Sequence, residues 1–222
     1  MAKELFDGEI IAVKRREQLG IFLLDGSGSM DEIGENNCSL AENVNRTFKD
    51  FICFFKDSSI KEEFQIAVIN FDYEATVKVP RTPLVDFDDF GNFNPRDQAK
   101  DNPGTDIGEG LRKAKEIIND YFNEPNPDQY PRTVTIATLS DGMCQRPEST
   151  IEIAKELNAD PRITISCCLF TTPKREKESL NKDVKNFLQD IKSQEGIYTV
   201  VKDNAVLRKF FNASMSSIKK QG

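Results

Sequence analysis

The sequence alternates short apolar runs with longer segments whose apolar residues recur every three or four positions. Short apolar runs are typical of strands buried on both faces, and the recurring spacing is typical of helices with one apolar face. This alternation predicts an α/β fold with a doubly wound, mostly parallel central sheet and helices on both faces. The predicted strands cover residues 20–24, 64–71, 75–79, 133–139, 163–170 and 197–201, and the predicted helices cover residues 40–55, 107–121, 151–157, 180–191 and 207–218.

Two connections between these elements carry further information. Only Asp72, Tyr73 and Glu74 separate the second strand from the third, so a hairpin with one antiparallel edge strand is expected. The stretch 81–103 contains three prolines and an acidic, aromatic sequence at residues 86–90, which predicts a long surface connection. Such connections are often functional, and a solvated excursion without a role is the alternative.

The 222 residues are expected to form one domain, residues 20–222, preceded by an extension of residues 1–19. The net charge of -7 provides no basic surface for phosphates, which argues against nucleic acid as a ligand. No apolar signal segment is present, and no run reaches the roughly 18 apolar residues of a bilayer span, so we expect no membrane association and a cytoplasmic location. The five cysteines, odd in number and without paired spacing, are expected to be free thiols.

The chain contains no histidine. This absence removes histidine-activated serine or cysteine nucleophiles, histidine-ligated zinc and the usual general base at neutral pH. The enzyme classes that depend on these groups are therefore excluded. We expect a protein that is not an enzyme.

Hydroxyl and carboxylate side chains gather at three places: after the strand 20–24, before the helix 107–121 and after the strand 133–139. Each place alone has a simpler explanation, namely a polar loop, a helix N-cap at Thr105 or Asp106, and an Asp-Gly turn. Together they gather oxygen atoms at the carboxyl ends of parallel strands, where open α/β sheets bind ligands. Such a sparse set of hard oxygen ligands favours Mg²⁺, with Mn²⁺ or Ca²⁺ as alternatives. The candidate metal ligands are Asp25, Ser27, Ser29, Thr105 and Asp141.

The segments 25–29, 104–105 and 140–142 (DGSGS, GT and SDG) resemble the metal ion-dependent adhesion site of von Willebrand factor type A domains. The resemblance extends over nearly the whole chain. It implies a partner protein whose Asp or Glu side chain completes the shell of the metal. It also implies that Ser27, Ser29 and, in the liganded state, Thr105 contact the metal directly, whereas Asp25 and Asp141 act through water.

Within that family the chain resembles bacterial cytoplasmic members associated with tellurium resistance, which implies a role in a stress or defence system. Gly26 stands where a larger residue is common and is expected to loosen its loop, and Gly110 stands where alanine is common and is expected to allow close helix packing. One alternative function is a Mg²⁺-dependent phosphohydrolase or phosphotransferase that uses Asp25, and another is a scaffold without metal. The sequence makes no prediction of the oligomeric state.

Overall fold

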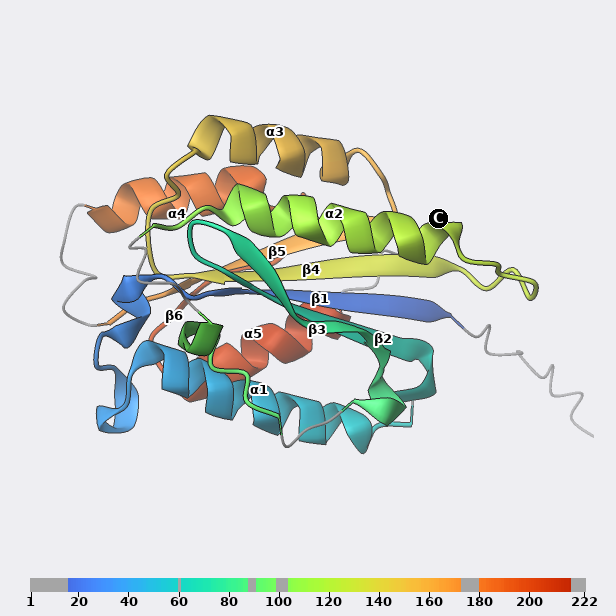
Figure 1. The fold of residues 1–222 in the computed structure, drawn as a ribbon, viewed down its shortest axis with the longest axis horizontal. Helices are drawn as coiled ribbons and strands as arrows, with labels where there is room; N and C mark the ends of the chain where they lie inside the picture. The colour runs from blue at the N-terminus through green and yellow to red at the C-terminus, as the bar shows by residue number, and fades with distance from the viewer. Residues whose placement is uncertain (1–15, 60, 88–90, 99–103, 173–179, 217–222) are drawn as a thin grey trace, which may run out of the picture.

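Six strands form one central sheet in the computed structural model, which describes residues 16–59, 61–87, 91–98, 104–172 and 180–216. The strands lie in the order β3-β2-β1-β4-β5-β6 (Figure 1). β2 and β3 pair antiparallel, and the other four neighbouring pairs are parallel, which confirms the predicted sheet with its antiparallel edge. The strands are β1 (Glu17–Asp25), β2 (Phe64–Phe71), β3 (Ala75–Pro83), β4 (Arg132–Ser140), β5 (Ile163–Phe170) and β6 (Tyr198–Val201).

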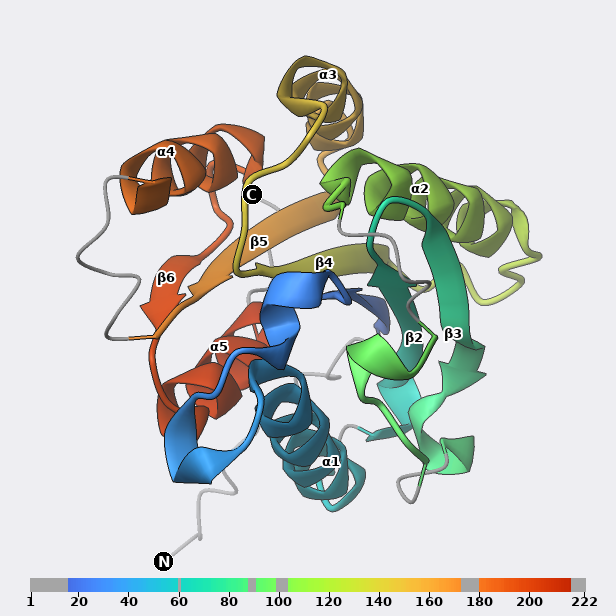
Figure 2. The same ribbon diagram turned by 60° about the vertical axis from the view of Figure 1, so that its left-hand side comes forward.

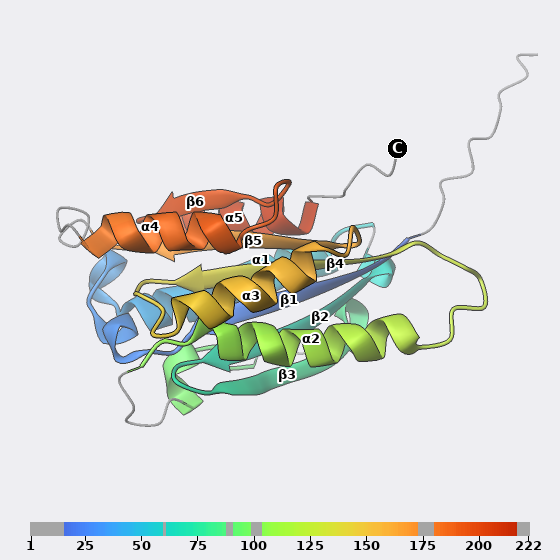
Figure 3. The ribbon, with the colours of Figure 1, turned by 90° about the horizontal axis from the view of Figure 1, so that it is seen from above.

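Helices cover both faces of this sheet. Two of them, α1 and α5, pack on one face, and α2, α3 and α4 lie on the other, as the side and top views show (Figures 1 and 3). The predicted apolar stripes therefore face the core on both sides. The helices are α1 (Leu40–Lys56), α2 (Ile107–Asn123), α3 (Pro147–Asn158), α4 (Leu180–Ile191) and α5 (Asn204–Ser216).

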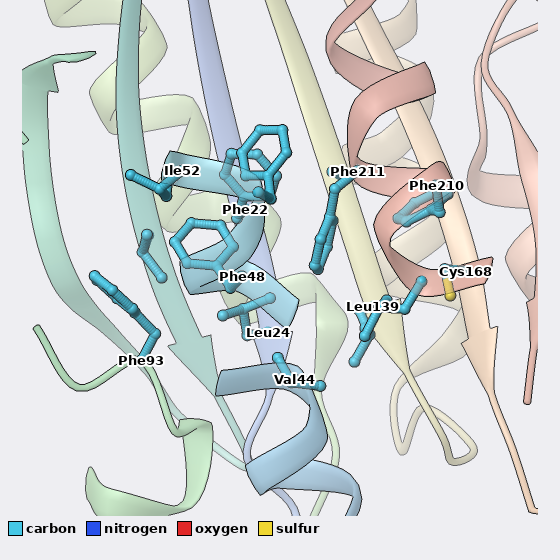
Figure 4. Packing of buried hydrophobic residues seen from close by; sticks show 14 of the residues in the cluster. Phe22, Leu24, Val44, Phe48, Ile52, Phe93, Leu139, Cys168, Phe210 and Phe211 are labelled. Atoms are coloured by element: carbon cyan, nitrogen blue, oxygen red, sulfur yellow. The ribbon is translucent and has the colours of Figure 1, made fainter. Parts of the chain in front are cut away.

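Phenylalanine rings fill the layer between the sheet and the helices α1 and α5. The ring centroid of Phe22, on β1, lies 4.8 Å from that of Phe48, 5.2 Å from that of Phe51 and 5.5 Å from that of Phe211. Figure 4 shows the side chains of Phe22, Phe48 and Phe211 in this layer. All four rings are buried, and aromatic pairs in such tilted arrangements contribute beyond the area that they bury. The layer on the other face is mostly aliphatic. β1 is thus held between two apolar layers.

The strand β1 lies where the chain connections diverge. From β1 the chain passes through α1 to β2 on one side, whereas β4, which pairs with the other side of β1, leads through α3 to β5. The register places Leu24 opposite Leu139, so β1 and β4 end at the same level. In open α/β sheets, the crevice outside the carboxyl ends of two such strands is where ligands bind.

The stretch predicted as a surface connection is partly buried. β3 runs to Pro83, beyond its predicted end, and Phe87 and Phe93 are each only 2% exposed. Their rings stack with centroids 5.6 Å apart against the α1 layer. The surface prediction is wrong for these residues, because large apolar rings are stabilised by leaving water. Residues 88–90 and 99–103 of the stretch lie outside the described residues.

The ends of the chain differ slightly from expectation. β1 begins at Glu17, so the last residues of the predicted extension 1–19 belong to the sheet, and residues 1–15 lie outside the described part. The predicted end of the last helix, residue 218, lies outside it as well. No helix within the described ranges is long and apolar enough to cross a bilayer. All five cysteines are free thiols, and three of them are buried.

Candidate metal centre

The loop at the end of β1, residues 25–31 (the metal loop), lies at the carboxyl ends of β1 and β4, and this place is called the crevice here. Figure 2 brings this edge of the sheet forward. The backbone N–H of Gly26 donates to the carbonyl of Phe71, at the end of β2, over 2.6 Å, and the N–H of Met30 donates to the carbonyl of Ser27 over 3.0 Å. The side chain of Met30 is fully buried. These contacts fix the loop at both ends, so its serines are held at the crevice.

The serines and aspartates at this crevice form two linked hydrogen-bond chains. The hydroxyls of Ser27 and Ser29 lie 2.9 Å apart, and the Ser29 hydroxyl donates to Asp141 Oδ1 over 2.7 Å. Asp25 Oδ1 accepts from the N–H of Ser27 over 2.8 Å, and Asp25 Oδ2 accepts from the hydroxyl of Ser140 over 2.5 Å. Four of the five predicted ligands therefore contact one another through one network.

Thr105, the fifth predicted ligand, lies near this network. Its carbonyl accepts a hydrogen bond from the N–H of Gln145 over 2.8 Å, which ties the start of α2 to the loop after β4. A methyl group built on Gly142 would lie 3.6 Å from Thr105 Oγ1 and 3.9 Å from Ser29 Oγ. The two hydroxyls thus face the space that a side chain at Gly142 would fill, and the structure brings all five predicted residues to one place.

The electrostatics of the crevice favour a cation. Asp25 is fully buried, and this burial, together with the neighbouring Asp141 carboxylate, raises the pKa of Asp25 to about 7, against the lowering effect of its hydrogen bonds from Ser140 and Ser27. Among the described residues, the ion pairs do not include Asp25. A divalent cation beside two such carboxylates would stabilise their charged forms.

The donor atoms also indicate which kind of metal fits. The described part of the chain has no group of three or more His, Cys, Asp or Glu side chains that could hold an ion. The oxygen set here is two carboxylates and three hydroxyls, without nitrogen or sulfur. Hard oxygen ligands of this kind suit Mg²⁺, Mn²⁺ or Ca²⁺. The residues fit a divalent cation, and their role as its ligands stays a prediction.

Asp106 shows how a buried carboxylate next to this site serves the fold instead. It is the N-cap of α2, and its Oδ1 accepts from the N–H of Gly108 over 2.9 Å. Its Oδ2 lies 3.4 Å from the guanidinium of Arg146, which also stacks over Tyr73. Of the two predicted N-cap candidates, Asp106 is the cap, which leaves the hydroxyl of Thr105 for the crevice.

The structure bears differently on the two expectations about the glycines. A Cβ on Gly26 would lie 2.6 Å from the carbonyl oxygen of Pro95, so this glycine allows a close backbone approach and does not loosen the metal loop. A Cβ on Gly110 would lie 3.4 Å from the side chain of Leu23, an ordinary van der Waals distance, so α2 contacts β1 here and the contact does not require a glycine.

The sequence placed Ser140 and Gly142 in the motif segment 140–142 but gave neither a role of its own, although their place next to Asp141 was the available signal. It gave no indication of a third residue that shapes the site. Arg96 donates to the carbonyl of Gly26 over 2.9 Å. It is 70 positions away in the chain, and no local pattern points to this contact.

The von Willebrand factor type A domain family matches residues 21–143, more than half of the chain. No curated protein matches the sequence. A pilus adhesin, SpaC from Lactobacillus rhamnosus GG, superposes with a TM-score of 0.71 at 12% identity, over 90% of this chain and 30% of the adhesin. A von Willebrand factor type A protein from Catenulispora acidiphila superposes with a TM-score of 0.59 at 16% identity, over 91% of this chain and 43% of that protein.

A third structure is proximal thread matrix protein 1 from the mussel byssus, solved with a zinc-occupied MIDAS motif. It superposes with a TM-score of 0.56 at 20% identity, over 90% of this chain and 45% of that protein. This chain spans less than half the length of each of the three. At such low identities the structures establish a shared fold.

Proposed function

Because this chain belongs to the von Willebrand factor type A domain family, we propose that it is a metal-dependent module that binds a partner protein at the carboxyl ends of β1 and β4. The observation that carries the proposal is the network of hydroxyls and carboxylates that joins Asp25, Ser27, Ser29 and Asp141 around one crevice. The site contains the carboxylates of Asp25 and Asp141, and no cationic side chain among the described residues pairs with Asp25. A bound divalent ion would supply positive charge beside these carboxylates.

The residues of the crevice divide into two kinds in this proposal. The hydroxyls of Ser27, Ser29 and Thr105 would hold Mg²⁺, or alternatively Mn²⁺ or Ca²⁺. The carboxylates of Asp25 and Asp141 would balance the charge of the ion. When bound, the ion would supply an electrophilic centre for the carboxylate of an Asp or Glu from the partner.

A catalytic role for Asp25 is disfavoured by its surroundings. A nucleophilic carboxylate needs an oxygen that can reach the substrate. Asp25 is fully buried, and its two oxygens accept hydrogen bonds from Ser27 and Ser140. The chain also lacks histidine as a general base. We therefore propose a binding protein that is not an enzyme, in place of the phosphohydrolase or phosphotransferase alternative.

The cellular setting is the narrower part of the proposal. We infer a cytoplasmic protein of a bacterial stress or defence system, similar to the tellurium-resistance-associated members of the family. This inference rests on the sequence resemblance, together with the free thiols of Cys144, Cys167 and Cys168 in the core, which suit a reducing compartment.

The test is capture of partner proteins by the immobilised chain in Mg²⁺, with three comparisons. Capture in EDTA and capture by Asp25→Asn are expected to lose the specific partner, because both disturb the metal. Capture by Glu17→Gln, at the opposite end of β1, is expected to retain it. A partner that stays bound in EDTA and to Asp25→Asn would show that the chain is a scaffold that needs no metal, and would overturn the proposal.

A further inference from the structure

Residues 91–98, here called the strap, contact both the metal loop and α1. The N–H of Phe93 donates to Asn45 Oδ1 over 2.9 Å, and the ring centroid of Phe93 lies 5.0 Å from that of Phe48. Phe93 and Asn45 are both buried. A buried backbone donor with a buried side-chain acceptor is costly to separate. One end of the strap is therefore fixed to the core (Figure 4).

The backbone of the strap touches the metal loop directly. The side chain of Asn94 accepts a hydrogen bond from the N–H of Arg96 over 2.9 Å and closes a tight turn. This turn brings the carbonyl of Pro95 to 2.6 Å from the position of a Cβ on Gly26. Only a glycine permits such an approach without displacement of one backbone, so the strap and the metal loop are packed as one unit.

The guanidinium of Arg96 spans the two serines of the metal loop. Its Nη1 donates over 2.9 Å to the carbonyl of Gly26, which precedes Ser27 and Ser29 in the sequence. Its Nε donates to the two carboxylate oxygens of Asp31 over 3.2 and 3.1 Å, and its Nη2 lies 2.9 Å from Asp31 Oδ2. Asp31 follows the two serines in the sequence. The planar fork of arginine suits such a bidentate contact, and a single point charge would not reproduce it.

We propose that Arg96 is a positioning residue of the metal site: it holds the metal loop in the curvature that directs the hydroxyls of Ser27 and Ser29 into the crevice. The inference rests on the proposed function, since it concerns the same site. Residues that orient metal ligands without touching the metal govern affinity by limiting the conformations of those ligands. The pairing of Arg96 with Asp31 also offsets the repulsion between its charge and a bound cation.

The first experiment compares the Mn²⁺ affinities of wild type, Arg96→Ala, Arg96→Lys and Arg81→Ala by calorimetric titration. Arg81 is the matched control, because its side chain is 19% exposed against 23% for Arg96 and it pairs with Glu124 far from the metal loop. Arg96→Ala is expected to weaken Mn²⁺ binding about tenfold. Arg96→Lys is expected to recover part of the affinity, and Arg81→Ala to bind as wild type does.

The second experiment measures amide hydrogen exchange in EDTA, which needs no metal. The N–H groups of Gly26, Met30 and Glu32 donate within or beside the metal loop, so Arg96→Ala should speed their exchange while Arg81→Ala should not. Equal Mn²⁺ affinity of Arg96→Ala and wild type would overturn the inference. If wild type binds no Mn²⁺, the proposed function fails. In that case faster exchange in Arg96→Ala still supports the positioning role, and unchanged exchange overturns it.

Discussion

Two acidic residues at opposite ends of β1, Glu17 and Asp25, have opposite surroundings. At the amino end, Glu17 of β1 lies 2.6 Å from the guanidinium of Arg132, and Glu124 pairs with Arg81. The hydrogen bond from Arg81 lowers the pKa of the Glu124 carboxyl. At the carboxyl end of the same strand, burial and the carboxylate of Asp141 raise the pKa of Asp25 to about 7.

The surroundings of these acidic side chains indicate different roles for the two ends of β1. At the amino end the protein neutralises each of these acids with its own arginine, an arrangement that needs nothing from outside. At the carboxyl end the described side chains supply hydroxyls to Asp25 and no cation. A buried carboxylate with a raised pKa lowers the stability of the folded chain near neutral pH, and such sites are typical of places that bind or react. A cation bound from solution would stabilise the charged carboxylate and so remove this loss of stability.

The largest expected effect is the loss of metal affinity in Asp25→Asn. This substitution keeps the shape of the side chain and removes its charge, so Mn²⁺ affinity should fall about 100-fold. Glu17→Gln, the corresponding change at the amino end of β1, should leave the affinity unchanged. Calorimetric titration of both variants measures this. If the two substitutions change Mn²⁺ affinity equally, the carboxyl end of β1 is not the specific metal site.

The pH dependence of stability in EDTA should have opposite signs at the two ends. The raised pKa of Asp25 contributes stability that is complete below pH 3.8, its unfolded value, and is lost as the pH rises through about 7. The lowered pKa of Glu124 contributes stability that is present above pH 4.5 and is lost as the pH falls. Glu124 is largely exposed, so its contribution is small.

Urea unfolding at a series of pH values in EDTA measures both contributions. Asp25→Asn should remove the decline between about pH 4 and pH 7 that the wild type shows. Glu124→Gln should change only the loss of stability that occurs as the pH falls below about 4.5. The same decline in wild type and in Asp25→Asn would mean that another group causes it.

Arg132→Ala should lower stability without an effect on the metal. Besides Glu17, the Arg132 guanidinium donates to the carbonyls of Tyr121 and Glu124 over 2.9 and 2.8 Å, and its side chain is only 10% exposed. Loss of these charge-assisted hydrogen bonds should reduce the free energy of unfolding by about 2 kcal/mol, measured by urea unfolding. A fall in Mn²⁺ affinity for this variant would contradict the division of roles.

The smallest expected effect comes from filling the gap between Thr105 and Ser29. Gly142→Val adds a side chain whose Cβ would lie 3.6 Å from Thr105 Oγ1 and 3.9 Å from Ser29 Oγ, and Mn²⁺ affinity should fall about tenfold. Gly28→Val is the matched control within the metal loop, because a Cβ there meets nothing within 4 Å. If Gly142→Val binds Mn²⁺ as wild type does, the gap is not part of the metal site.

The sequence predicted the parts of the site that follow local rules. Apolar runs that end in Asp25 and in Ser140 indicate the ends of strands, and parallel strands bring their carboxyl ends to one edge. Thr105 was predicted because it precedes an amphipathic segment. The structure brings these residues together, and the alternation of apolar runs was enough to predict the sheet.

The strap and its contacts could not be predicted in the same way. Arg96 contacts Gly26 in a stretch of chain where Phe87 and Phe93 are buried and pack against the α1 layer. That path depends on tertiary packing of irregular chain, which has no periodicity for a sequence pattern to reveal. The prolines and acidic residues of the stretch favoured a solvated connection, and the burial of its aromatic rings outweighed them.

The most direct test of the central claim is anomalous diffraction from crystals of the protein grown or soaked with Mn²⁺. The claim is that the carboxyl end of the sheet holds a divalent cation. It predicts one strong anomalous peak in the crevice lined by Ser27, Ser29, Thr105 and Asp141, and none at the arginine-paired acids of the amino end. A crevice without a peak at saturating Mn²⁺, or a peak only elsewhere, would contradict it.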